Sequence, residues 1–145
     1  MTRMVLIGLA LAAVSTPSAA AERARAQVGC EATGEKLVYR CMAMLTGRKS
    51  GKPVSGAVVQ ASADMPSMAM AHNVRPVRLK PAGKPGLYSF TMKLEMYGLW
   101  AVKLKMSKPT PDIIIARLRF TKDGASPPGK NKGRGTVKPN GQETN

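Results

Sequence analysis

Histidine, aromatic residues and acidic residues are scarce in this sequence. Its 145 residues include one His, one Trp, three Tyr, two Phe and 8 Asp and Glu together. The single imidazole, on His72, excludes within one chain every metal site built on two histidines, such as blue-copper sites and two-His zinc sites. The scattered acids form no pair suited to glycosidase chemistry, and no Gly-rich phosphate loop follows a strand. We therefore predict that the protein is not an enzyme.

Long apolar runs are also missing. The most apolar stretch spans Met4–Val14, after Arg3 and before the small residues Ala19-Ala20-Ala21. It is too short to cross a bilayer core, which needs about twenty residues. The arrangement is typical of a secretory signal peptide, so we predict cleavage after Ala21 and export to the periplasm. An uncleaved N-terminal anchor is the alternative.

Cysteine occurs only at Cys30 and Cys41. Their spacing is wider than that of a redox pair or a zinc knuckle, and an exported protein meets oxidising conditions. Because Thr33-Gly34 between them is a turn signal, we predict a structural disulfide that clips a β-hairpin. Two thiolates that bind a soft metal are the alternative.

From residue 36 onward, apolar residues alternate with polar ones, which is typical of half-buried antiparallel strands. The predicted strands are 37–45, 54–63, 77–80, 88–94, 100–106 and 114–120. Short strands at intervals of about ten residues predict an all-β fold, a small antiparallel immunoglobulin-like β-sandwich of about seven strands.

The composition divides the chain into four parts. They are the signal peptide at 1–21, an N-terminal segment with the start of the hairpin at 22–35, the β-sandwich at 36–122 and a basic tail at 123–145. The tail is rich in Pro and Gly and has Val137 as its one branched-chain residue, so we predict that it is disordered.

The segment from Asp64 to Asn73 carries the chemistry, and we call residues 65–72 the Met loop. It holds Met65, Met68, Met70 and His72. Thioethers with one imidazole suit Cu(I) or Ag(I) better than hard cations, and such a ligand set is electrically neutral. In an extended segment, Met68, Met70 and His72 would project from one face. The alternative is that these methionines are flexible core filler.

Two further residues are candidates for the same site. Met96 precedes the Tyr97-Gly98 turn and is a candidate distant ligand or lid. Trp100 is a candidate cap over the metal, although a tryptophan in a sandwich is more often a core residue. Met92 shares a face with Tyr88 and Phe90, so we predict that it belongs to the core.

Four pieces of sequence, in order, resemble a known family. They are Gly51-Lys52-Pro53-Val54-x-Gly56-Ala57, Asp64-Met65-Pro66-x-Met68-x-Met70-x-His72, Gly86-x-Tyr88 and Met96-x-Gly98-x-Trp100-x-Val102. Together they are similar to the YtkA-like and FixH-like family of exported domains. The resemblance implies an immunoglobulin-like β-sandwich that works beside copper efflux, copper carriage or the assembly of copper-containing oxidases. It also implies that the Met loop faces the metal and that residues 96–100 form the neighbouring strand start.

These observations lead to one functional expectation and one alternative. We expect a periplasmic Cu(I) carrier or accessory protein whose partner is an envelope protein of a copper transport or assembly system. FixH proteins usually keep a membrane anchor, whereas this chain has a predicted cleavable signal peptide. Oxidase assembly is therefore the less favoured of the roles that the resemblance implies. The alternative is an interaction module without metal that docks on another envelope protein through its basic sandwich surface.

The charge is strongly one-sided, with 23 Lys and Arg against 8 Asp and Glu and a net charge of +15. A field of one sign attracts acidic partners or the anionic surface of a membrane, and salt screens that attraction. Nucleic acid is not an expected partner, because an exported domain with so few aromatics offers little for bases to stack on. A solvated basic surface with no specific partner is the alternative.

Overall fold

The computed structural model describes residues 22–68, 71 and 73–129. They contain nine strands and one short 3-10 helix: β1 (Ala24–Ala32), β2 (Val38–Gly47), β3 (Val58–Asp64), η1 (Pro66–Met68), β4 (Asn73–Arg78), β5 (Lys80–Pro81), β6 (Leu87–Lys93), β7 (Gly98–Lys108), β8 (Asp112–Thr121) and β9 (Gly124–Ser126). The predicted all-β antiparallel fold is confirmed. The described part has nine strands rather than about seven, because β5 and β9 add to the six predicted strands and the predicted start of the hairpin.

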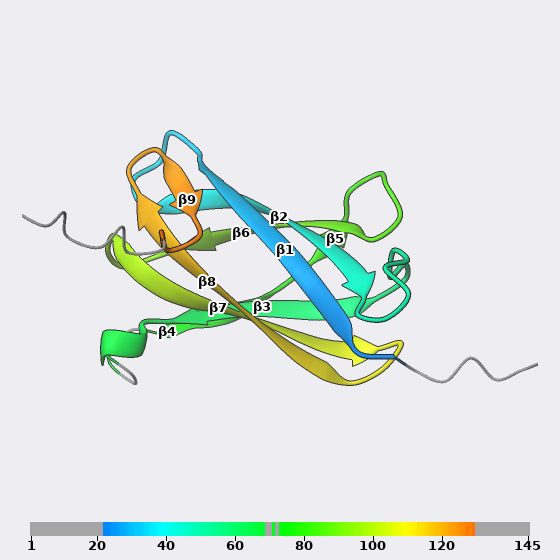
Figure 1. Cartoon of the computed structure of the whole chain (residues 1–145). Coiled ribbons are helices and arrows are strands. Elements are labelled where there is room, and N and C mark those ends of the chain that lie inside the picture. Colours follow the sequence, from blue (N-terminus) through cyan, green and yellow to red (C-terminus); the bar gives the residue numbers. More distant parts are fainter. Residues whose placement is uncertain (1–21, 69–70, 72, 130–145) are drawn as a thin grey trace, which may run out of the picture.

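The strands form two layers around one core (Figure 1). Their order is β4-β3-β7-β8-β9-β1-β2-β6-β5, and every pairing is antiparallel. The sheet folds over itself, so that β3, β7 and β8 lie opposite β1, β2 and β6. The largest side chains buried between the layers are Trp100, Tyr39, Tyr88, Phe120 and Leu45. Tyr39 and Phe120 meet edge to face, with their ring centroids 4.8 Å apart.

The hairpin of β1 and β2 carries the disulfide. Cys30 and Cys41 are cross-strand partners with Cα atoms 4.1 Å apart, and their sulfurs are bonded. The turn between the strands includes Gly34 at φ 74° and Leu37 at φ 63°. The predicted disulfide-clipped hairpin is therefore confirmed, and the two-thiolate metal site is excluded in this oxidised state.

The sandwich begins earlier in the chain than predicted, with strand β1. This strand pairs with β2 from Ala24↔Gly47 to Ala32↔Tyr39, so the segment 22–35, predicted to hold the start of the hairpin, is itself part of the sandwich. The inward positions of β1 are the small residues Ala24, Ala26 and Val28. Such residues give a weak alternation of hydrophobicity, and this is why the sequence predicted the start of a hairpin here but not the bounds of the strand.

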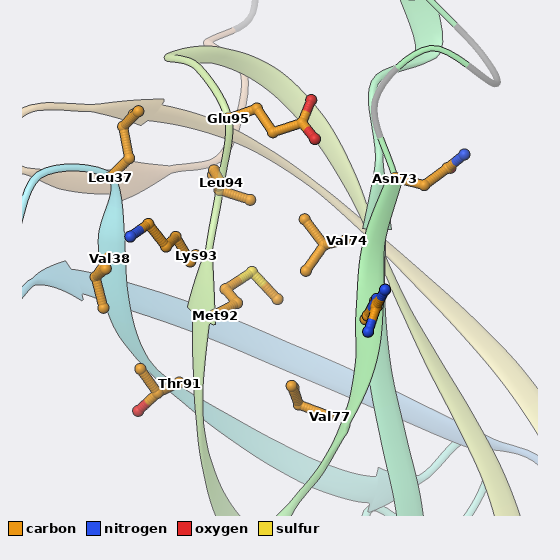
Figure 2. A pocket seen from close by; sticks show the side chains of 11 residues that line it. Leu37, Val38, Asn73, Val74, Val77, Thr91, Met92, Lys93, Leu94 and Glu95 are labelled. Carbon is orange, nitrogen blue, oxygen red and sulfur yellow. The ribbon is translucent and has the colours of Figure 1, made fainter.

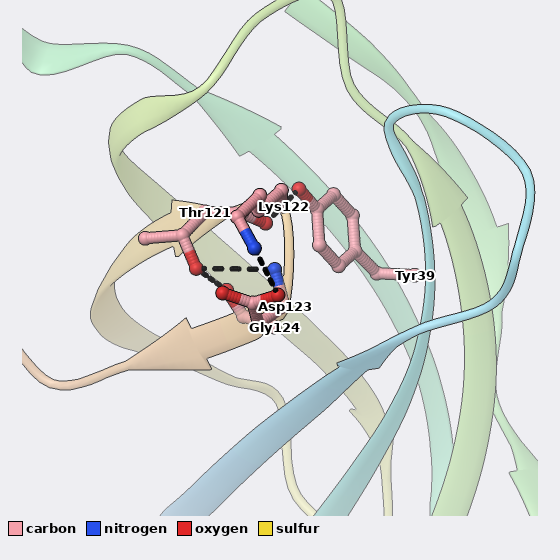
Figure 3. Close-up of polar contacts among 5 residues, drawn as sticks. All are labelled: Tyr39, Thr121, Lys122, Asp123 and Gly124. Carbon is pink, nitrogen blue, oxygen red and sulfur yellow. Dashed lines mark hydrogen bonds and ion pairs between the residues drawn. The ribbon is translucent and has the colours of Figure 1, made fainter.

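The hairpin of β8 and β9 extends the sandwich beyond its predicted end at residue 122 (Figure 3). Residues 124–126 were expected in a disordered tail, but they form β9, which pairs with β8 and with β1. The hydroxyl of Thr121 donates to the carbonyl of Gly124 at 3.1 Å, and the Tyr39 hydroxyl donates to the carbonyl of Thr121 at 2.7 Å. Burial, and secondly Tyr97, raise the pKa of Tyr39 above its ordinary value. Residues 130–145 lie outside the described part.

Two predicted strands have different bounds in the structure. The strand expected at 54–63 begins only at Val58, and Val54 lies in the preceding loop. The strand expected at 77–80 is split into β4, which begins earlier at Asn73, and the short β5. The division occurs because the chain crosses between the two layers at Leu79, whose side chain is buried.

The predicted signal peptide at 1–21 lies outside the described residues, and its cleavage is still a prediction. Among the residues that are described, no helix has the length and apolar character needed to span a bilayer.

Removal of the disulfide is expected to destabilise the fold. For the double variant Cys30→Ala/Cys41→Ala, we expect the free energy of unfolding to fall by about 3 kcal/mol, because the denatured chain regains the freedom of the closed loop. Urea unfolding of the oxidised wild type and of the variant measures the difference. Equal unfolding free energies would show that the bridge does not contribute to stability.

Asp112 predicts a pH dependence of stability. Its side chain is 5% exposed, and burial raises its pKa. Bonds from the Ala24 amide (3.0 Å), the Arg23 guanidinium (3.2 Å) and the Ile113 amide (2.9 Å) lower it, and the net pKa lies below its ordinary value. A lowered pKa stabilises the fold above the unfolded-state pKa of about 3.9, and the contribution is lost as the pH falls through the folded-state pKa.

We therefore expect Asp112→Asn to lower the unfolding free energy by about 1 to 2 kcal/mol at neutral pH. The difference from wild type should shrink below about pH 4. Thermal unfolding between neutral and acidic pH measures it, with Asp123→Asn as the control, since the Lys122–Asp123 pair is exposed. A difference that does not change with pH would contradict the assigned role.

Candidate functional site

The Met loop connects two paired strands at one end of the sandwich. Asp64 at the end of β3 is the cross-strand partner of Asn73 at the start of β4. The chain turns immediately after β3, because the amide of Met68 donates to the carbonyl of Met65 at 3.0 Å and the amide of Ala71 donates to that of Met68 at 3.1 Å. The extended arrangement considered from the sequence is therefore wrong at Pro66–Met68, which form η1. Proline suits this position because its fixed φ is compatible with a helical turn.

Met65 is packed inward rather than displayed. Its side chain is buried and belongs to the core cluster. It lies against Gly98 at the start of β7: a Cβ placed on Gly98 would be 3.1 Å from the Met65 Cε. Gly98 also has φ 141°, a conformation that favours glycine. The close approach fixes the first residue of the Met loop to the first residue of β7.

Met68 and Met96 are on the surface at the same end of the molecule. Their exposed fractions are 40% and 36%, which is high for large apolar side chains. Met68 ends η1, which contacts β7, and Met96 lies two residues before β7 begins. Figure 1 shows η1 and the start of β7 at this end of the sandwich. The structure thus brings Met65, Met68 and Met96 to one end, although they come from two segments of the chain.

Trp100 is a core residue. It is fully buried, and its indole N–H donates to the carbonyl of Met96 at 3.1 Å. The bond satisfies the one polar atom of the indole and holds the turn that carries Met96. The side chain therefore has a positioning role toward Met96, whereas its predicted role as a cap over the metal stays a prediction. Met92 is a core residue, as predicted.

Met70 and His72 lie outside the described residues. In the sequence they lie between Met68 and Asn73, on either side of Ala71. Their predicted roles as ligands therefore remain predictions.

The acid that precedes the Met loop is paired. Asp64, the acid closest in sequence to the Met loop, forms an ion pair with Lys103 on β7. The thioethers are neutral. Within residues 22–68, 71 and 73–129, no three His, Cys, Asp or Glu side chains lie close enough together to hold a metal ion.

Sequence reasoning missed the role of Gly98 as the partner of Met65. The sequence shows only that Gly98 follows a turn, and the contact is made between residues 33 positions apart in the chain. The available signal was a glycine at the first position of a strand in which apolar and polar residues alternate strictly. Glycine in a strand often marks a place where another part of the chain packs closely against the backbone.

A family model described as YtkA-like matches residues 38–105, a range that includes the Met loop, Met96 and most of β7. The match confirms the resemblance inferred from the four sequence pieces. No curated protein and no solved structure matches the chain.

The contact between Met65 and Gly98 can be tested by Gly98→Ala. We expect the unfolding free energy to fall by about 1 kcal/mol or more, because φ 141° strains a residue with a Cβ and the methyl would press on Met65. Chemical denaturation measures the change. Gly29→Ala is the matched control, since a Cβ there would meet nothing within 4 Å. Equal effects of the two substitutions would contradict the proposed contact.

Proposed function

Because this chain carries a YtkA-like domain over residues 38–105, we propose that the protein is an exported, non-enzymatic Cu(I) carrier. It holds the ion as cargo and passes it to, or accepts it from, an envelope protein of a copper transport or assembly system. The proposed ligands are the thioethers and imidazole of the Met loop together with the second methionine segment: Met65, Met68, Met70, His72 and Met96.

The observation that carries the proposal is the exposure of Met68 and Met96 at one end of the sandwich. A thioether that only fills a core is buried, as Met92 is. Exposed thioethers from two segments are neutral and soft donors, and Met65 is a third thioether that the core holds at the start of the same loop. Such a set suits a monovalent soft cation, which gains little from carboxylates.

Met65 and Met96 have different parts in this arrangement. The backbone of Met96 is held by the buried indole of Trp100, so its side chain starts from a fixed point. Met65 is buried against Gly98, so it ligates only if its sulfur faces the loop when copper is bound. Separate substitution of each methionine distinguishes a ligand from a core residue.

The test is a competition titration of the oxidised full chain against a colorimetric Cu(I) chelator under anaerobic conditions. We expect a single ion per chain with sub-micromolar or tighter affinity. His72→Ala, Met96→Leu and the double variant Met68→Leu/Met70→Leu should each weaken or abolish binding, because leucine keeps the volume of methionine but removes the sulfur. Absence of competition by the wild type would contradict the carrier function.

The matched control is Met42→Leu/Met44→Leu. These half-buried methionines lie on β2, and their cross-strand partners on β6 are Ser89 and Leu87. The double variant removes as many sulfurs as Met68→Leu/Met70→Leu but leaves the Met loop intact. Equal loss of Cu(I) affinity in both double variants would show that the loop is not the site.

A second function is favoured by the outer face of β7 and β8. Ile113 and Ile115 are 59% and 57% exposed there, and their cross-strand partners are Lys105 and Lys103. Exposed isoleucines beside cations are suited to docking on another envelope protein. A module of this kind keeps its partner when Met68 and Met70 become leucine, whereas a carrier loses its cargo.

A further inference from the structure

A groove lies between β4 and β6, where the two ends of the strand order approach each other. Its volume is about 790 Å³. Figure 2 shows Val74 and Val77 of β4 pointing across it toward Met92 and Leu94 on the β6 side. The floor is therefore apolar. Leu37, which lines one end, has the unusual φ of 63° for a residue with a side chain.

The backbone of β6 faces this groove. In an antiparallel ladder, successive residues direct their N–H and C=O groups to opposite sides. The amide of Leu94 donates toward the β2 side, to the carbonyl of Leu37 at 2.9 Å, so Thr91 and Lys93 direct theirs toward the groove. On that side, β5 pairs only with Tyr88 and Ser89 within the described part of the chain. Thr91 and Lys93 thus offer a strand edge.

The opposite edge is a poorer template. Strand β4 contains Pro76, which has no N–H, and its register with β3 shifts between Ala61 and Ala63. Proline and irregular register are devices that block strand addition at a sheet edge. Strand β6 has neither proline nor glycine. An added strand would therefore pair with β6 and place its side chains against β4.

The rim of the groove is basic. Arg75 lines it directly, and Arg40, Arg78 and Lys80 line a second hollow of about 370 Å³ that shares Val77 and Thr91 with the first. Lys93 is paired with Glu35 at 3.1 Å, and one acid, Glu95, lines the end of the groove. The other four cations outnumber that acid, so the two hollows together are basic. An occupant with acidic side chains complements this charge.

The chain's own C-terminal segment does not have that chemistry. Residues 130–145 carry Lys130, Lys132, Arg134 and Lys138 against the single acid Glu143. Their charge has the same sign as the rim of the groove. A segment from another protein is therefore the better occupant.

We propose that the groove between β4 and β6 binds an extended segment of a partner protein in which apolar and acidic residues alternate. The segment adds as a strand to Thr91 and Lys93 of β6 by main-chain hydrogen bonds. Its apolar side chains fill the space among Val74, Val77 and Met92, and its carboxylates meet Arg75 and Arg78. This site does not depend on the proposed binding of copper.

The probe is a fluorescein-labelled peptide of about seven residues that alternates Glu and Val, the length of a short strand. Fluorescence anisotropy with the full chain at physiological salt should show saturable binding with a Kd in the micromolar range. A peptide with Lys in place of Glu should not bind. Amide hydrogen exchange of Thr91 and Lys93 should slow when the acidic peptide is present.

Two matched pairs of variants locate the site. Arg75→Glu/Arg78→Glu should weaken binding about tenfold or more, while Arg117→Glu/Arg119→Glu, an equal charge change on the exposed face of β8, should have little effect. Thr91→Pro removes the edge N–H and should weaken binding, while Thr91→Ala keeps the N–H and should not. If Thr91→Pro does not fold, the charge pair and the hydrogen exchange decide the question.

Three results would overturn the proposal. The first is no saturable binding of the acidic peptide. The second is equal weakening by both charge-reversal pairs, which would show attraction to net charge rather than to the groove. The third is a dimer, seen by sedimentation, that Arg75→Glu/Arg78→Glu dissociates, since a second copy of this chain would then be the occupant.

Discussion

The burial of Trp100 between the two layers is the interaction on which the rest of the structure depends. Its side chain is the largest of those fully buried. It stands near the start of β7, the strand that pairs with β3 on one side and β8 on the other. The same side chain donates its N–H to the carbonyl of Met96. The core and the turn that carries the exposed methionine are therefore held by one residue, and a change in the packing of Trp100 would move both.

The sequence predicted the parts of the fold in which large apolar residues alternate with charged ones. Strand β7, with Trp100, Val102 and Leu104 inside and Lys103 half-exposed, is the clearest case. The pattern failed where the inward residues are small, as with Ala24 and Ala26 of β1, and where a strand is only three residues long, as with β9. In neither case is the hydrophobic period strong enough to be seen, and long-range pairing supplies the stability instead.

The sequence predicts which residue types make up the candidate site, but it does not predict how the backbone of the Met loop is folded. The residue types of the Met loop indicate soft-metal chemistry, whereas the helical turn at Pro66–Met68 and the contact of Met65 with Gly98 depend on packing across strands. The groove was beyond sequence reasoning for the same reason. Val74 and Met92 meet there only because the strand order brings its two ends together. Asn73 at the end of the Met loop and Glu95 beside Met96 both line that groove, so a partner held there would lie next to the methionines.

The central claim is that sulfur from two segments of this chain binds Cu(I). X-ray absorption spectroscopy of the copper-loaded full chain tests it most directly, because the technique reports which elements surround the metal. The account predicts a shell dominated by thioether sulfur with one imidazole nitrogen, and fewer sulfurs when Met96 is replaced by leucine. A shell of oxygen and nitrogen alone, unchanged by that substitution, would contradict it.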